Sequence, residues 1–180
     1  MEKKIVIALL SQSEKKISKE LERHLQNVFN LKVEFLPIKL DLNFAFNGER
    51  RQYLASSILE KLRNFKKEGF EKWLAICDVD LFAEGLNFVF GEADIEEGVS
   101  IISLSRLRQS FYGLPDDERL FLERIQKEAT HELGHLFHLG HCQNPNCVMY
   151  FSNSILDTDR KSKFFCEKCQ KILQSYLEKK

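Results

Sequence analysis

Residues 131–142 read HELGHLFHLGHC and hold four of the chain's five histidines. His131 and His135 are four residues apart, so on a helix their imidazoles project from successive turns and can bind one ion. Glu132 lies roughly 60° around that helix from His135, close enough to reach a water on the ion without being a ligand. This pattern is typical of a zinc hydrolase, where zinc lowers the pKa of a water to about 7 and a glutamate takes the proton.

A catalytic zinc usually keeps three protein ligands and one open position, and the sequence offers two candidates for the third. His138 stays on the same helical face but lies about 4.5 Å further along the axis than His135, so its reach to a shared ion is strained. His141 follows Gly140 and arrives from a chain that has left the helix. At this point both candidates stay open.

The pattern of apolar residues predicts an α/β fold. Strands are expected in five segments, namely 4–10, 31–38, 73–82, 86–93 and 99–107. Helices are expected after the first strand, from about Glu49 after the second, and from Pro115 to about His138. Such an order favours a mostly parallel, twisted sheet, and the short link between the last two strands permits an antiparallel edge strand. In the long helix the apolar stripe faces the sheet and the histidines face away.

Four cysteines lie in the last quarter of the chain: Cys142, Cys147, Cys166 and Cys169. Two close pairs separated by eighteen residues predict a closed tetrahedral zinc site, which is structural and not catalytic. Two disulfides in a secreted protein are the alternative, but the N-terminus reads as a first strand and not as a signal peptide. The fifth cysteine, Cys77, is expected to be a core residue.

The composition of the chain limits the classes of partner that it is expected to bind. The 27 basic residues balance 27 acidic ones, so no overall charge draws the chain to nucleic acid or to an anionic membrane. No segment approaches the roughly 20 apolar residues that span a bilayer. We expect a monomeric cytoplasmic protein. At 180 residues we also expect one compact catalytic domain, divided into a sheet-and-helix part, 1–141, and a C-terminal part, 142–180.

The spacing His-Glu-x-x-His and then His after five more residues is the extended motif of the metzincin metallopeptidases. Downstream, the order His-Cys-x4-Cys-x-Met…Cys-x-x-Cys resembles the archaemetzincin family, and the similarity covers residues 73–170. Two positions depart from the family. His138 stands where metzincins carry a glycine at a sharp turn, and sixteen residues, not seventeen, separate Met149 from Cys166.

The resemblance implies a catalytic zinc on His131, His135 and His141, with Glu132 as general base. It also implies a structural zinc on the four clustered cysteines and a Met-turn at Met149 beneath the catalytic ion. The implied fold is metzincin-like: a mixed, mostly parallel sheet, a long active-site helix and a small zinc-bound C-terminal subdomain. Its edge strand, here residues 86–93, would align an extended peptide substrate.

Two other classes of function compete with a metallopeptidase. The first is a catalytically silent, zinc-stabilised protein that binds peptides, for which His138 in place of glycine is the only hint and against which Glu132 argues. The second is a zinc-ribbon module that binds nucleic acid. From Cys142 to Lys180 the chain holds seven basic and four acidic residues, an excess too small to favour that function.

Overall fold

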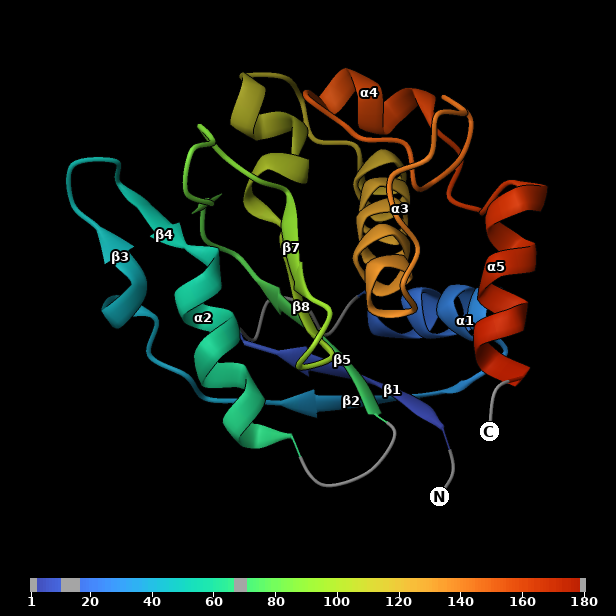
Figure 1. Ribbon diagram of the computed structural model, residues 1–180. Helices are drawn as coiled ribbons and strands as arrows, with labels where there is room; N and C mark the ends of the chain where they lie inside the picture. The colour runs from blue at the N-terminus through green and yellow to red at the C-terminus, as the bar shows by residue number, and fades with distance from the viewer. Residues whose placement is uncertain (1–2, 11–16, 67–70, 179–180) are drawn as a thin grey trace.

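The computed structural model describes residues 3–10, 17–66 and 71–178. Its main sheet has five strands in the order β2-β1-β5-β8-β7 (Figure 1). Their bounds are β1 Lys4–Leu9, β2 Lys32–Pro37, β5 Glu71–Cys77, β7 Gly91–Asp94 and β8 Val99–Ser103. The first four in spatial order run parallel, and β7 pairs antiparallel with β8 at the edge. The predicted α/β fold with a mostly parallel sheet is therefore confirmed.

Helices cover both faces of this sheet (Figure 1). Because side chains alternate along a strand, Ile5 and Ile7 point into one core and Val6 and Ala8 into the other. The first core lies beneath α1 (Ser18–Phe29) and α3 (Glu118–Leu136), and α5 (Glu167–Glu178) adds Leu173 to it. The second core lies beneath α2 (Ala55–Leu62). Among the described residues, none of the helices combines the length and apolarity needed to cross a membrane.

A second, three-stranded sheet was not predicted. It consists of β3 (Phe46–Asn47), β4 (Gln52–Leu54) and β6 (Leu81–Phe82), in the order β3-β4-β6. The Asn47 side chain accepts a hydrogen bond from the Arg50 backbone N–H, and Arg51 adopts φ 55°, so the chain reverses where a helix was expected. The helix predicted from Glu49 therefore begins only at Ala55, and the strand predicted at 73–82 divides between the two sheets.

The edge strand β7 is shorter than predicted. Of the expected strand 86–93, only Gly91 to Ala93 belong to β7, which continues to Asp94. Before it, Leu86 closes a turn to Ala83, and Val89 makes an isolated bridge to Leu81. Phe90 still accepts a hydrogen bond from the Ser103 N–H, but residues 86–89 lie outside the main sheet. Residues 86–90 become a wall of the site described below.

Helix α3 carries the histidine motif. It begins after Asp117, whose carboxylate caps the helix by accepting a hydrogen bond from the Leu120 N–H at 2.9 Å. The predicted apolar stripe is buried: Ile125, Ala129, Leu133 and Leu136 are fully inaccessible to solvent. These residues pack toward the sheet, which leaves the motif histidines on the other side of the helix.

His24, on α1, is the one histidine of the chain that lies outside residues 131–142. Its side chain is buried between α1 and α3, with Nε2 3.0 Å from the Thr130 hydroxyl and the ring beside Phe164. Burial, reinforced by the nearby charge of Lys163, lowers the pKa of His24 to about 4. The imidazole is therefore neutral in the folded protein at physiological pH.

Neutral burial of His24 predicts a loss of stability in mild acid. Between pH 6.5 and pH 4 the unfolded chain binds a proton at His24 and the folded chain does not. The free energy of unfolding therefore falls as the pH falls. From pH 7.5 to pH 5 this contributes a loss of about 2 kcal/mol. Urea unfolding of the wild type and His24→Gln at both pH values measures it. The variant should lose less stability by about that amount, and equal losses would contradict the assignment.

Candidate metal sites and active-site pocket

Three histidines converge at the C-terminal end of α3, two from the helix and one from the segment after it. One ligand nitrogen each from His131, His135 and His141 lies within 4.8 Å of the others. The Nε2 atoms of His131 and His135 are 3.1 Å apart, a separation that two nitrogens bound to one zinc ion at about 2.0–2.1 Å can adopt. The donor set is three imidazoles with Glu132 beside them, and its chemistry and spacing fit a zinc ion.

The other ring nitrogens of two of these histidines are fixed by backbone carbonyls. His131 Nδ1 lies 2.8 Å from the Val148 carbonyl oxygen, and His135 Nδ1 lies 2.8 Å from that of Leu139. Each Nδ1–H donates to its carbonyl, so each Nε2 presents a lone pair toward the centre of the cluster. Burial lowers the pKa of all three cluster histidines, and the nearby Lys161 contributes. The neutral form, which binds metal, is therefore favoured.

His138 does not join the cluster. It is exposed, and its ring lies 5.0 Å from the ring of Tyr176 on α5. Its backbone adopts φ 62°, the left-handed conformation that a glycine would take without cost. The chain thus makes the sharp turn after α3 with a histidine in place of the usual glycine, and His141 arrives at the cluster from beyond that turn.

Glu132 lies at the boundary between α3 and the edge strand. Its side chain is 5% exposed, and a Cβ atom added to Gly91 would lie only 2.7 Å from the Cγ and Oε1 atoms of Glu132. Burial raises the pKa of the Glu132 carboxyl well above its usual range, and the charge of Glu128 one turn away raises it further. Gly91 therefore provides the space in which this carboxylate sits.

Met149 lies directly beneath the histidine motif. It is fully buried, and a Cβ atom added to Gly134 would lie 2.5 Å from its sulfur. Gly134 stands between His131 and His135 on the helix, so the thioether packs against the turn that carries both histidines. The Met149 carbonyl also accepts a hydrogen bond from the Cys142 N–H at 2.9 Å.

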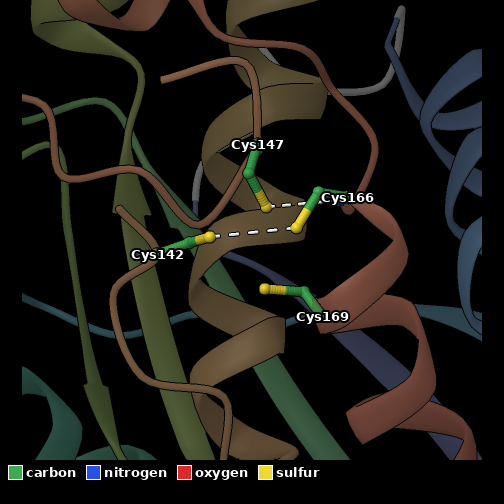
Figure 2. A group of neighbouring side chains, drawn as sticks. All are labelled: Cys142, Cys147, Cys166 and Cys169. Atoms are coloured by element: carbon green, nitrogen blue, oxygen red, sulfur yellow. Dashed lines mark hydrogen bonds between the residues drawn. The ribbon is translucent and has the colours of Figure 1, made fainter. Parts of the chain in front are cut away.

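The four clustered cysteines also come together (Figure 2). Their sulfur atoms lie within 4.8 Å of one another, and those of Cys142 and Cys166 are 3.8 Å apart. Four sulfurs at about 2.3 Å from a zinc ion in tetrahedral geometry are about 3.8 Å apart. The thiols are close enough for one ion to bind all four. The backbone N–H of Cys169 lowers the pKa of the Cys166 thiol to about 7, which favours the thiolate.

The two clusters share one segment of backbone. Cys142 follows His141 in the chain, and Cys147 comes immediately before Val148, whose carbonyl orients His131. Cys147 is fully buried and belongs to the core beneath α3, together with Cys169 and Leu173. The cysteine cluster therefore lies where it can hold both His141 and the carbonyl that orients His131.

A pocket opens beside His131 and Glu132. Its volume is about 210 Å³, and its walls come from residues 86–91, from α3 and from residues 151–153. Two charged residues at its inner end, Glu128 and Lys161, were not singled out from the sequence. Lys161 follows the short helix α4 (Ile155–Arg160), which Arg124 holds against α3 through two 2.7 Å hydrogen bonds to Asp159. Glu128 precedes Glu132 by one turn of α3 and lies outside the His-Glu-x-x-His motif, so that motif does not mark it.

These features together define a metallopeptidase of the metzincin kind: a helix with the His-Glu-x-x-His motif, a third histidine beyond a left-handed turn, and a buried methionine beneath them. Residues 3–175 match the sequence model of peptidase family M54. An archaemetzincin of Pyrococcus abyssi is 52% identical over 134 residues, or 74% of this chain and 71% of that protein.

Solved structures agree with this match. The crystal structure of archaemetzincin from Methanopyrus kandleri has a TM-score of 0.87 and 38% identity, covering 99% of this chain and 97% of that one. A zinc-dependent peptidase from Methanocorpusculum labreanum has a TM-score of 0.85 and 33% identity, covering 94% and 99%. The chain belongs to peptidase family M54. The predicted resemblance to archaemetzincins and the predicted class of enzyme, a metallopeptidase, are confirmed.

Proposed function

We propose that the protein is a zinc-dependent peptidase that hydrolyses peptide bonds with Glu132 as general base. The observation that carries this proposal is the convergence of His131, His135 and His141 beside the buried carboxylate of Glu132. His141, not His138, is the third ligand in this proposal, because His138 turns away toward Tyr176.

We assign two zinc ions to the chain. The three histidines would hold the catalytic ion, and Cys142, Cys147, Cys166 and Cys169 would hold a structural ion. The first set leaves a position open to water, whereas four thiolates close the second. Zinc at the histidines would supply Lewis acidity toward a water molecule and a peptide carbonyl.

The chain's own groups would supply binding and proton transfer. The Glu132 carboxylate would take a proton from the attacking water and pass it to the leaving amine. Strand β7 is the last strand of its sheet, with one edge unpaired in the described part of the chain. An extended peptide laid along that edge would make main-chain hydrogen bonds at the position where Gly91 meets Glu132.

Replacing Gly91 by alanine should lower kcat about 10- to 100-fold. The added methyl group would collide with the Glu132 side chain and with the Ile101 carbonyl oxygen, both at 2.7 Å, so either the carboxylate or β7 must move. Displacements of about 1 Å at a reacting group can cost about 100-fold. Steady-state kinetics on one peptide measures the effect. Gly48→Ala is the control, because no atom lies within 4 Å of its added methyl group. Equal kcat for both variants would contradict the role given to Gly91.

Removal and return of zinc tests the proposal. The protein is incubated with a peptide mixture before and after treatment with a chelator, and cleavage is read by mass spectrometry. Cleavage should stop when the histidine site is emptied and return when zinc is added back. Cleavage that persists with both sites empty would refute a zinc-dependent reaction.

The competing functions find less support in the structure. The hint for a silent peptide-binding protein was His138, and this residue makes the required turn without entering the histidine cluster. The hint for a nucleic-acid-binding zinc ribbon was the cysteine spacing, and these cysteines pack into the core beneath α3. The division of the chain at residue 141, the monomeric state and the cytoplasmic location stay predictions from the sequence.

A further inference from the structure

The inner end of the active-site pocket holds a buried ion pair that the proposed reaction does not use. Lys161 Nζ lies 3.1 Å from Glu128 Oε1, and the side chains are 0% and 4% exposed. The Thr158 hydroxyl donates to the same Glu128 oxygen at 3.2 Å, and Lys161 Nζ also reaches the Tyr150 carbonyl at 3.4 Å. Both charged residues border the pocket that His131 and Glu132 also line.

Two polar atoms on residues that border this pocket lack partners in the described part of the chain. Glu128 Oε2 receives no hydrogen bond from any residue that the structure describes. The Ser152 hydroxyl, which borders the same pocket, is buried without a hydrogen-bond partner in that same part of the chain. A ligand group that bonds these atoms gains affinity over an apolar group that leaves them unpaired. The pocket therefore favours a ligand group that donates a hydrogen bond to the Glu128 carboxylate and also bonds the Ser152 hydroxyl.

The Glu128–Lys161 ion pair favours an uncharged ligand group over a charged one. Glu128 alone would attract a cationic side chain, but Lys161 already neutralises it and would repel a second cation. An anionic side chain would meet the carboxylates of Glu128 and Glu132. An uncharged hydroxyl or amide avoids both penalties.

The walls of the pocket decide the rest of the side chain. Phe88, Phe90 and Phe151 border it, and the rings of Phe88 and Phe90 meet edge-to-face at 5.1 Å. Its volume of about 210 Å³ equals roughly seven waters, which suits one large side chain. Aromatic walls favour an aromatic ring. We propose that this pocket selects a tyrosine side chain of the substrate, whose hydroxyl donates to Glu128 and bonds Ser152; the proposal rests on the peptidase function above.

Two readouts test this selectivity. The first uses peptides that are identical except for Tyr, Phe, Arg or Glu at one position, with kcat/KM and the residues flanking each cut read by mass spectrometry. The kcat/KM of the peptide with tyrosine next to the cut should exceed that of the phenylalanine peptide by roughly 10-fold or more, because only tyrosine carries a hydroxyl that can donate to Glu128. The second readout is NMR titration of the zinc-loaded protein with N-acetyl-tyrosine amide and N-acetyl-phenylalanine amide, which needs no cleavage.

The matched variant replaces both charges at once, as Glu128→Leu with Lys161→Met. A single replacement would leave an unpaired buried charge and destabilise the fold, whereas an apolar pair of similar volume is tolerated. In the double variant the ratio of kcat/KM for the tyrosine peptide to kcat/KM for the phenylalanine peptide should fall to about one, whatever the change in the overall rate. Ser152→Ala, which removes the second partner and no charge, should reduce the ratio only in part.

The outcomes separate the two proposals. Preference for tyrosine in either readout, lost in the double variant, supports selection by this pocket. Equal use of tyrosine and phenylalanine, or a preference for arginine or glutamate, would overturn it even if the protein cuts peptides. If no peptide is cut, the proposed peptidase function fails, and the titration still decides the selectivity: equal affinity for both amides would overturn it.

Discussion

Replacing His141 by alanine is expected to reduce kcat/KM by more than about 100-fold and to reduce bound zinc from two ions to one. Loss of a group that only orients a ligand costs 10- to 100-fold in affinity or activity, so loss of a ligand should cost more. His141 supplies the third nitrogen of the cluster. Its segment is held by the hydrogen bond from the Cys142 N–H to the Met149 carbonyl. Elemental analysis and peptide kinetics measure both quantities.

His138→Ala is the matched control for this prediction. The residue lies three positions away and is exposed, and its ring contacts Tyr176 and not the cluster. Both zinc ions should stay bound and kcat/KM should change little. If His138→Ala loses the zinc and His141→Ala keeps it, the assignment of the third ligand is wrong.

Replacing Cys147 by serine is expected to empty the cysteine site and to lower Tm by roughly 10 °C or more. Zinc binding to structural sites contributes about 10–16 kcal/mol in small zinc-binding peptides, and a drop of several kcal/mol in a chain of 180 residues corresponds to such a shift. Cys147 is fully buried in the core beneath α3, so the freed thiols would also disturb packing there. Calorimetry and zinc counting measure the effect.

Cys77→Ser is the matched control. Cys77 is also buried, but it lies in β5, far from the cluster in the sequence, and its thiol donates to the Ile102 carbonyl at 3.5 Å. A serine can make the same bond, so Tm should fall by less than about 5 °C with both zinc ions retained. If the two variants lose stability equally, the cysteine cluster has no special structural role.

The central strands β1, β5 and β8 could be predicted because they are mostly apolar runs. Residues 4–9 and 73–77 alternate between two buried cores, and a strand buried on both faces leaves a clear signal. The small second sheet has no such sequence signal, because β3, β4 and β6 are only two or three residues long. The helix start predicted at Glu49 was wrong because the turn at Asn47 and the positive φ of Arg51 interrupt the helix, although the apolar residues there have helical spacing.

The members of the two candidate metal clusters could be predicted because ligand spacing is local. His131, His135 and Glu132 share one helix, and the cysteines come in close pairs. Glu128, Lys161 and Gly91 could not, because their importance depends on contacts between distant segments. Lys161 meets Glu128 only after α4 has packed against α3 through Arg124 and Asp159, and Gly91 meets Glu132 across the sheet edge.

Cleavage of a diverse peptide mixture by the zinc-loaded protein, beside its Glu132→Ala variant, tests the proposed mechanism most directly. The substitution removes the carboxylate next to the histidines and leaves all seven proposed ligands in place. We predict two bound zinc ions in both proteins, with cuts that appear in the wild type and vanish in the variant. Equal cleavage by both would contradict the role of Glu132, and no cleavage by a wild type with both sites filled would contradict the peptidase function itself.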